Sequence, residues 1–270
     1  MCSSDLVTTI FAKKYNLWVI EDCCDALGSR YDGKLTGTFG HIATFSFYPA
    51  HQITMGEGGA VVTNNPLIHR SLRQFRDWGR DCWCDTGKDN TCGKRFSWEL
   101  GDLPYGYDHK YIYSQIGFNL KLTDFQAAIG VAQIEKLPGF IAKRKKNYQY
   151  FYHFFKKHKK YFQILEIDQT KCDPCWFGFP FFVRKEAPFN RTELTQYLES
   201  KKIGTRNVFS GNLLHQPAYK NVQYRKIGSL ENADMVMNQS CWLGVFPGID
   251  MQRLQYIKQM ISEFVTHYEK

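Results

Sequence analysis

The 270-residue sequence predicts an α/β protein in two parts: a larger domain around a mixed, mainly parallel sheet, and a smaller C-terminal α+β domain. The first observation is a short apolar run ending in acidic residues, the pattern of a strand within a parallel sheet. The second is a set of three short strand-like segments followed by two helix-like segments in the first half of the chain. The third is a change of character near residue 140, where a long basic and aromatic segment with helical spacing begins.

Three strands are expected in the larger domain. Residues 17–20 form the apolar run, and we expect this strand to be buried on both faces, with Glu21 and Asp22 at its carboxyl end. Residues 43–47 and 59–63 are the other two strands, joined through a glycine-rich turn. Because ligands of open α/β sheets collect at strand ends, we expect the functional site there.

Two helices and a long loop complete the larger domain, which we place at residues 1–140. Residues 66–78 predict a helix, and a second one begins at Thr123, which has capping-box spacing to Gln126. Residues 79–116 between them lack periodicity, and structureless stretches of that length are usually functional or disordered. The apolar stripes expected to face the core are Ile68, Leu72 and Phe75 in the first helix and Phe125, Ala128, Ile129 and Ala132 in the second.

The second domain is placed at residues 141–270. A basic and aromatic helix runs to about residue 158, an apolar run covers 176–183, and a helix spans 190–201. A final helix follows Asp250 and carries its apolar residues on one face: Leu254, Ile257, Ile261 and Phe264. No internal repeat is present.

The charge and the composition limit the kinds of protein that this chain can be. The net charge of +9 and the mixed basic and aromatic residues of the long helix suggest a nucleic-acid groove, but helical spacing favours core packing, and no nucleic-acid partner is expected. At 43% hydrophobic residues the chain matches a globular protein. No apolar run approaches the roughly 20 residues of a membrane span, and no secretory pattern begins the chain. We therefore expect a cytoplasmic protein without a membrane partner.

Nine cysteines are many for a cytoplasmic protein, where clustered cysteines more often hold metal or do chemistry. Cys24, Cys82, Cys84 and Cys92 have the spacing C-x57-C-x-C-x7-C, which is not a ferredoxin pattern and by itself allows an iron-sulfur cluster, zinc or free thiols. Cys23 is expected to be a packed thiol. Cys172 and Cys175 are expected in a surface loop. No role is inferred for Cys2 or Cys241.

Three segments together resemble a known family. Residues 19–28 read VIEDCCDALG, residues 46–59 read SFYPAHQITMGEGG, and residues 117–130 read GFNLKLTDFQAAIG. In this order and spacing they resemble the DegT/DnrJ/EryC1/StrS sugar aminotransferase family, and the likeness covers nearly the whole chain. The resemblance implies the PLP-dependent transferase (aspartate aminotransferase) fold, with a partial large domain, and a homodimer acting on nucleotide-linked keto-sugars.

The resemblance also implies roles for the matched residues. Asp22 would pair with the pyridine nitrogen of the cofactor, so that the ring accepts electrons. Asp25 would contact the ring hydroxyl, Ser46 the phosphate, and Asn119 the phosphate bound in the neighbouring subunit. Outside this motif, an aspartate at a strand end is more often a helix cap.

Position 51 departs from the aminotransferases. They carry the cofactor-capturing lysine five residues after the serine, where this chain has His51. Imidazole cannot capture the cofactor covalently, so His51 implies noncovalent pyridoxamine 5'-phosphate (PMP) and a base that titrates near neutrality. The family's 3-dehydratases show this histidine. The alternative is a degenerate aminotransferase that has lost its lysine.

The cysteine spacing resembles that of the 2Fe-2S dehydrases that remove the 3-hydroxyl of CDP-4-keto-6-deoxyglucose, for the 3,6-dideoxyhexoses of lipopolysaccharide. Cys24 lies two residues past Asp22, close to the expected cofactor ring. By resemblance, electrons come from a separate NAD(P)H-dependent flavin and iron-sulfur reductase. Zinc or free thiols remain the alternative.

Two other functions stay open. One is a cluster-free PMP-dependent 3-dehydratase that regenerates its amine from glutamate, and the other is a catalytically silent partner subunit of an aminotransferase-like dimer. Arg206, Asn212 and His215 are candidate substrate contacts, each at least as well explained as structural. Because the match begins almost at residue 1, we expect the family's N-terminal part, with its phosphate loop and ring-stacking residue, to be missing.

Overall fold

The computed structural model describes residues 5–85 and 87–269 and divides into two compact units. The first unit comprises the described residues up to Leu27 together with Lys34–Glu135. The second comprises Gly28–Gly33 and the described residues from Lys136 onward. The division at residues 135 and 136 lies close to the expected boundary near residue 140. No helix within the described ranges is both long and apolar enough to cross a membrane.

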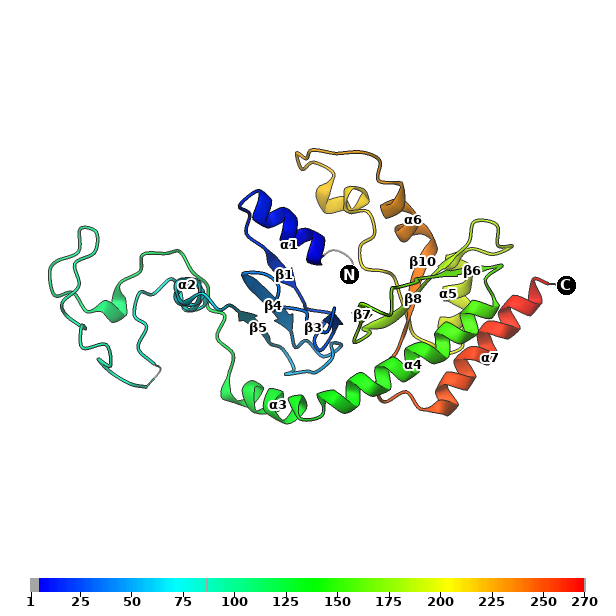
Figure 1. Ribbon diagram of the computed structural model, residues 1–270, viewed down its shortest axis with the longest axis horizontal. Coiled ribbons are helices and arrows are strands. Elements are labelled where there is room, and N and C mark those ends of the chain that lie inside the picture. Colours follow the sequence, from blue (N-terminus) through cyan, green and yellow to red (C-terminus); the bar gives the residue numbers. More distant parts are fainter. Residues whose placement is uncertain (1–4, 86, 270) are drawn as a thin grey trace. The chain divides into compact units, whose positions relative to one another are not determined.

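The first unit contains a three-stranded sheet in the order β1-β4-β5. β1 pairs parallel with β4, and β4 pairs antiparallel with β5, so the sheet is mixed, as predicted. Figure 1 shows helix α1 leading into β1 and α2 following β5. The elements are α1 (Asp5–Lys14), β1 (Ile20–Asp22), β3 (Lys34–Leu35), β4 (Ile42–Ser46), β5 (Gly59–Val62), α2 (Pro66–Arg76), η1 (His109–Tyr111) and α3 (Asp124–Ile134).

Glu21 anchors the carboxyl end of β1. Its buried carboxylate accepts backbone hydrogen bonds from Gly37, Phe39 and Gly40 at 2.7, 2.7 and 2.6 Å. Three charge-assisted bonds of this length offset the cost of burying the carboxylate. Because side chains alternate along a strand, the neighbouring Asp22 points to the other face of the sheet, where it is exposed.

The first unit is less buried than its sequence predicts. The strand begins at Ile20 instead of residue 17, and Trp18 and Ile20 are 65% and 63% exposed, so the expectation of a strand buried on both faces was wrong for this chain. The stripes of α2 and α3 are also not buried: Phe125 is 85% exposed, and Gly130 is the buried residue of α3. These apolar faces lack a second layer among the described residues. The capping box of Thr123 is confirmed.

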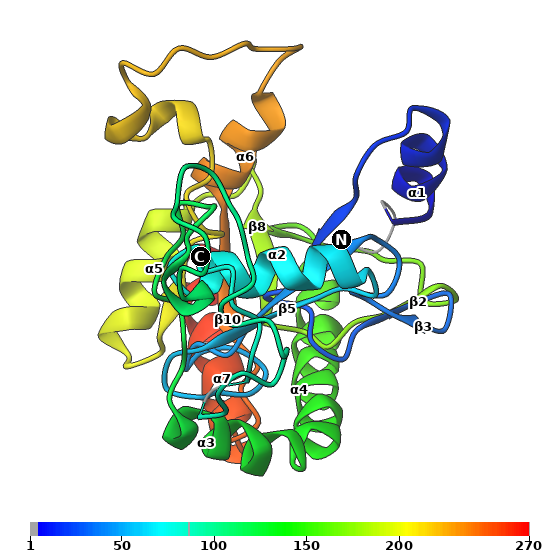
Figure 2. The ribbon, with the colours of Figure 1, turned by 90° about the vertical axis from the view of Figure 1, so that its left-hand side faces the viewer.

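The stretch between α2 and α3 is irregular, as predicted, and its described residues contain one short helical turn, η1 (Figure 1). Its two ends are held together by buried Asp81, which accepts hydrogen bonds from the backbone N–H and hydroxyl of Ser114 at 2.8 and 2.7 Å and from Gln74 at 2.8 Å. After Asp81 the loop runs back along α2 (Figure 2). The Arg70 guanidinium of α2 lies 4.2 Å from the ring centre of Trp83 in this loop.

The second unit combines helices with an antiparallel sheet, and besides the residues from Lys136 onward it includes Gly28–Gly33, which were expected in the larger domain. Its four-stranded sheet has the order β6-β8-β10-β9, and every pairing within it is antiparallel. Helices α4 and α7 lie side by side along this sheet (Figure 1). The elements are α4 (Leu137–Lys157), β6 (Phe162–Ile164), β8 (Gly178–Val183), α5 (Arg191–Ser200), β9 (Thr205–Arg206), η2 (Leu213–His215), η3 (Pro217–Tyr219), α6 (Glu231–Gln239), β10 (Ser240–Gly244) and α7 (Met251–His267), with the short pair β2 (Arg30–Tyr31) and β7 (Cys172–Asp173).

The aromatic residues of α4 form the core of this unit. Phe155 is fully buried, with its ring centre 5.0 Å from that of Phe179 and 4.5 Å from that of Phe181. Leu254 and Ile261 of α7 are buried in the same cluster. The interpretation of the helix as a core helix is therefore confirmed.

Cys172 and Cys175 do not lie in a surface loop, and that expectation was wrong. Cys172 belongs to β7, and Cys175 is 1% exposed, with its backbone N–H donating to the Ser29 hydroxyl at 2.9 Å. Burial raises the pKa of the Cys175 thiol to about 11. Cys23 is a packed thiol, as predicted, and Cys241 is also buried. Cys2 lies outside the described residues.

Candidate active site and cysteine centre

Asp22 ends β1 as an exposed carboxylate with polar neighbours. Its Oδ1 accepts a hydrogen bond from the backbone N–H of Cys24 at 3.1 Å and from the Thr44 hydroxyl at 3.3 Å. Hydrogen bonds from the thiol and the backbone N–H of Cys24, and then from Thr44, lower the pKa of this carboxyl. Asp22 is thus negatively charged at neutral pH and able to pair with a protonated ring nitrogen.

His51 and Asp25 form a pair close to this strand end. Nε2 of His51 lies 3.2 Å from Oδ1 of Asp25, and the two side chains are 15% and 18% exposed. Burial raises the pKa of the Asp25 carboxyl, attraction to His51 opposes that rise, and repulsion from Asp22 adds to it. The contact of Asp25 with the ring hydroxyl of the cofactor, implied by the resemblance, stays a prediction, and in the structure the Asp25 carboxylate lies against the imidazole of His51.

Local packing fixes the segment that carries His51. The backbone N–H of His51 donates to the Tyr48 carbonyl at 2.9 Å, and Gln52 donates to the Asp25 carbonyl at 2.7 Å. Met55 packs against Gly130 of α3, where an added Cβ would lie 3.0 Å from the Met55 side chain. The segment is therefore held at both ends, which keeps the imidazole against Asp25.

Ser46 and Asn119 have different hydrogen-bond partners. Ser46 ends β4 half-buried and accepts a hydrogen bond from the backbone N–H of Tyr48 at 3.3 Å. Asn119 is exposed, and its side-chain oxygen accepts from Lys121 at 2.7 Å. Lys121 also donates to Asp77 at 3.0 Å. The role of Asn119 toward a neighbouring subunit stays a prediction.

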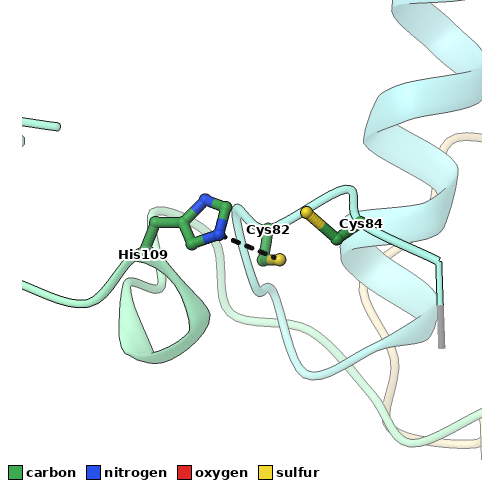
Figure 3. Close-up of side chains that lie close together, drawn as sticks. All are labelled: Cys82, Cys84 and His109. Carbon is green, nitrogen blue, oxygen red and sulfur yellow. Dashed lines mark hydrogen bonds between the residues drawn. The ribbon is translucent and has the colours of Figure 1, made fainter. Parts of the chain in front are cut away.

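The loop brings Cys82, Cys84 and Cys92 around one histidine. The sulfurs of Cys82 and Cys92 lie 3.5 and 3.8 Å from Nε2 of His109. One ligand atom from each of Cys82, Cys84 and His109 falls within 4.8 Å of the other two (Figure 3). Sequence reasoning missed His109, because a single histidine in an aperiodic loop gives no signal of its own.

The electrostatics suit thiolate chemistry at Cys84. A hydrogen bond with the Thr91 side chain is the largest of the effects that lower the pKa of this thiol to about 7, and bonds with Cys92 and Cys82 also contribute. A thiol with this pKa is about half ionised at neutral pH, and ionised thiols are the form that binds metals.

Cys24 is not part of this group. Its sulfur lies 3.8 Å from the Thr44 hydroxyl, beside Asp22, and burial raises the pKa of its thiol. The structure therefore brings together the three loop cysteines that the sequence selected, and leaves the fourth at the end of β1.

The candidate substrate residues all lie in the second unit. Asn212 is buried and donates to Asp234 at 2.6 Å, while His215 contacts the same carboxylate at 3.1 Å. Arg206 donates to the carbonyl of Thr205 at 2.7 Å. Asn212 also caps η2. The contacts of Asn212 are those of a structural residue, and the substrate roles of all three residues remain untested.

Comparison with known proteins identifies the family. The model of the DegT/DnrJ/EryC1/StrS aminotransferase family matches residues 2–262. The chain belongs to this family. The PLP-dependent transferase fold is likewise confirmed: the E. coli GDP-4-keto-6-deoxy-D-mannose-3-dehydratase with bound hydrated PLP aligns with a TM-score of 0.79 and 25% identity, over 94% of this chain and 62% of that one.

Two curated relatives are considerably more similar in sequence. The lipopolysaccharide biosynthesis protein RfbH of Salmonella typhimurium is 52% identical over 94% of this chain. A dTDP-4-dehydro-2,6-dideoxy-D-glucose 3-dehydratase of Saccharopolyspora spinosa is 46% identical over the same share. The chain spans 58% and 55% of the length of these two relatives.

Chemical labelling of the thiols should separate the cysteine centre from the packed cysteines. In native, metal-free protein we expect an alkylating reagent to modify Cys84 first near pH 7, because its pKa is about 7 and its side chain is accessible. Cys175 and Cys241, with pKa values of about 11 and 12, should stay unlabelled until the protein unfolds. Peptide mapping by mass spectrometry measures this order, and labelling of Cys175 as fast as Cys84 would contradict the burial described above.

Proposed function

We propose that this chain is part of a PMP- and 2Fe-2S-dependent enzyme that removes the 3-hydroxyl of CDP-4-keto-6-deoxyglucose, a cytoplasmic homodimer serving 3,6-dideoxyhexose and lipopolysaccharide synthesis. The pairing of His51 with Asp25 carries the proposal, because an imidazole held by a carboxylate could act as a base at the position where the aminotransferases have a lysine. The similarity to RfbH and to a named 3-dehydratase supports it.

PMP would supply an amine that joins the C4 ketone of the sugar and a ring that accepts electrons. Asp22 would hold the ring nitrogen protonated, and Ser46 would bind the phosphate. Nε2 of His51 lies 3.2 Å from Oδ1 of Asp25, so this carboxylate would orient the imidazole that acts as the base. His51 would take the proton from the C4′ carbon of the cofactor and deliver it to the departing 3-hydroxyl.

The loop cysteines fit an iron-sulfur cluster, since three thiols converge and the pKa of one of them is about 7. Cys24 would be the fourth ligand, which requires the loop to reach the end of β1. Such a site would pass single electrons from a separate NAD(P)H-dependent flavin and iron-sulfur reductase toward the cofactor. The exposed aromatic residues of the loop, such as Tyr105 at 76%, are consistent with a loop that covers further surface once the ligands assemble.

The full-length protein, purified without oxygen, tests the proposal. We expect about two iron atoms per protomer, a visible iron-sulfur spectrum, and formation of a 3,6-dideoxy-4-keto sugar from the CDP substrate when the reductase is added. GDP- and dTDP-linked 4-keto sugars, assayed in parallel, test the nucleotide. An iron-free protein that transfers an amino group to the sugar would refute the proposal.

A cluster-free 3-dehydratase is the second candidate, and the separation of Cys24 from the loop cysteines favours it. Such an enzyme would regenerate its amine from glutamate. Iron-free protein that forms the 3-deoxy sugar with glutamate as co-substrate would select this candidate.

Asp25 should act as a positioning residue for His51. Replacing Asp25 with Asn removes the negative charge that fixes the imidazole, and we expect exchange of the cofactor's C4′ proton with solvent to slow by about 10²-fold, at the lower end of the range for general acid–base catalysis. The matched control is Asp32→Asn, at an exposed turn position. Equal exchange rates in both variants would show that the pair with His51 does not matter.

A further inference from the structure

His109 is a fully buried side chain within a loop whose residues are otherwise mostly exposed. Its Nε2 lies 3.5 Å from the sulfur of Cys82, the shortest contact between the imidazole and the cysteines (Figure 3). Such a separation is within the range of a hydrogen bond to sulfur. The burial of this residue does not follow from the proposed chemistry, and it calls for a role of its own.

The surroundings hold the imidazole in one orientation. Its backbone N–H donates to the Arg95 carbonyl at 3.0 Å, and the Arg95 guanidinium binds the Asp108 carboxylate through two N–H groups, at 3.0 and 2.6 Å. The ring also packs edge-on against Trp98, with 4.9 Å between ring centres and an angle of 83°. Because both the backbone and the ring of His109 are held by neighbouring groups, its imidazole is preorganised toward Cys82.

The chemistry of sulfur decides what the imidazole does there. A thiolate bound to metal offers only lone pairs, so a nitrogen that faces it must donate a hydrogen bond. Hydrogen bonds to ligand sulfurs stabilise the more negative, reduced state of an iron-sulfur cluster and are one of the means by which proteins set its potential. Trp83 and Trp98, whose ring centres lie 4.7 Å apart, add an apolar wall beside His109 that shields this bond from water.

We propose that His109 donates a hydrogen bond from Nε2 to the sulfur of Cys82 and thereby raises the reduction potential of the cluster held by the loop. The inference rests on the proposed function, because it requires the cluster. His109 is in this role a positioning and tuning residue, and Cys24, Cys82, Cys84 and Cys92 remain the proposed ligands.

Two substitutions in full-length protein purified without oxygen test the proposal. His109→Phe keeps an aromatic ring against Trp98 but removes the donor, and His109→Gln keeps an N–H near the position of Nε2. We expect both variants to retain iron. The reduction potential, followed by electron paramagnetic resonance, should fall in the Phe variant by about 59 mV, a tenfold change in a one-electron equilibrium constant, and return most of the way in the Gln variant.

A measurement on the wild type keeps the test independent of variant folding. Pulsed electron paramagnetic resonance of the reduced cluster should show a weakly coupled nitrogen and an exchangeable proton. A strongly coupled nitrogen would make His109 a ligand, and no nitrogen coupling, or equal potentials in all three proteins, would mean that the bond is absent; each result overturns the inference. A wild type without iron would overturn the proposed function and this inference together, whereas the other failures leave the proposed function intact.

Discussion

Replacing His51 with Asn should slow C4′ proton exchange and dehydration by about 10³-fold, within the range observed when a general base is lost. The amide of asparagine is not basic, so it cannot take the proton, although it retains a donor toward Asp25. Release of deuterium from C4′-labelled cofactor into water measures the effect directly. The absorbance of the proposed iron-sulfur cluster should remain, since the group of possible metal ligands found among the described residues of the loop is Cys82, Cys84 and His109.

The matched control is His153→Asn, the same substitution at an exposed position of α4. It should exchange the C4′ proton at the wild-type rate. A companion variant, His51→Lys, should restore covalent capture and show new visible absorbance when pyridoxal phosphate is added. If His51→Asn exchanged the C4′ proton at the wild-type rate, His51 would not be the base. The main support for the proposed function would then be lost.

Local patterns predicted the elements well where the partner surface lies within the chain. Thr123 and Asn190 start their helices with capping boxes, because a short side chain at the N-cap and a glutamine or glutamate three residues later satisfy each other's backbone groups. The stripe of α7 is buried as expected, since α4, α5 and the sheet supply its partners. Trp18 and Phe125 obey the same apolar patterns but remain exposed, because a pattern specifies a face without specifying what covers it.

The candidate site was predictable to the extent that it depends on residue identity. Asp22 stands out because it matches the carboxylate of the family's motif at the end of a strand, and His51 stands out because it replaces the lysine of the aminotransferases. The approach of His51 to Asp25 and the burial of His109 depend on how loops fold back, and a single sequence carries no periodic signal for loops. The cysteine spacing selected the three loop thiols that converge, but spacing alone gives no distance between Cys24 and the loop.

Changing Cys82 to Ser should eliminate the proposed cluster while sparing the first half of the proposed reaction. Serine is a poor substitute for a thiolate ligand of iron, so we expect the iron content to fall from about two atoms per protomer to near zero. C4′ proton exchange should continue, because Asp22 is held by Cys24 and Thr44, and His51 lies against Asp25. Formation of the 3-deoxy sugar with reductase should fall to background, since single electrons no longer reach the cofactor.

Comparison with two other serine variants makes this result specific. Cys172→Ser changes a thiol of the second unit, in β7, and should leave the iron content unchanged. Cys24→Ser should lose iron as completely as Cys82→Ser if the strand end supplies the fourth ligand. Loss of C4′ exchange together with iron in Cys82→Ser would assign the loop cysteines a structural role. Full iron in Cys24→Ser would instead confine the ligands to the loop, where the His109 imidazole lies 3.5 Å from the sulfur of Cys82. This pair of measurements therefore tests whether the end of β1 contributes a ligand.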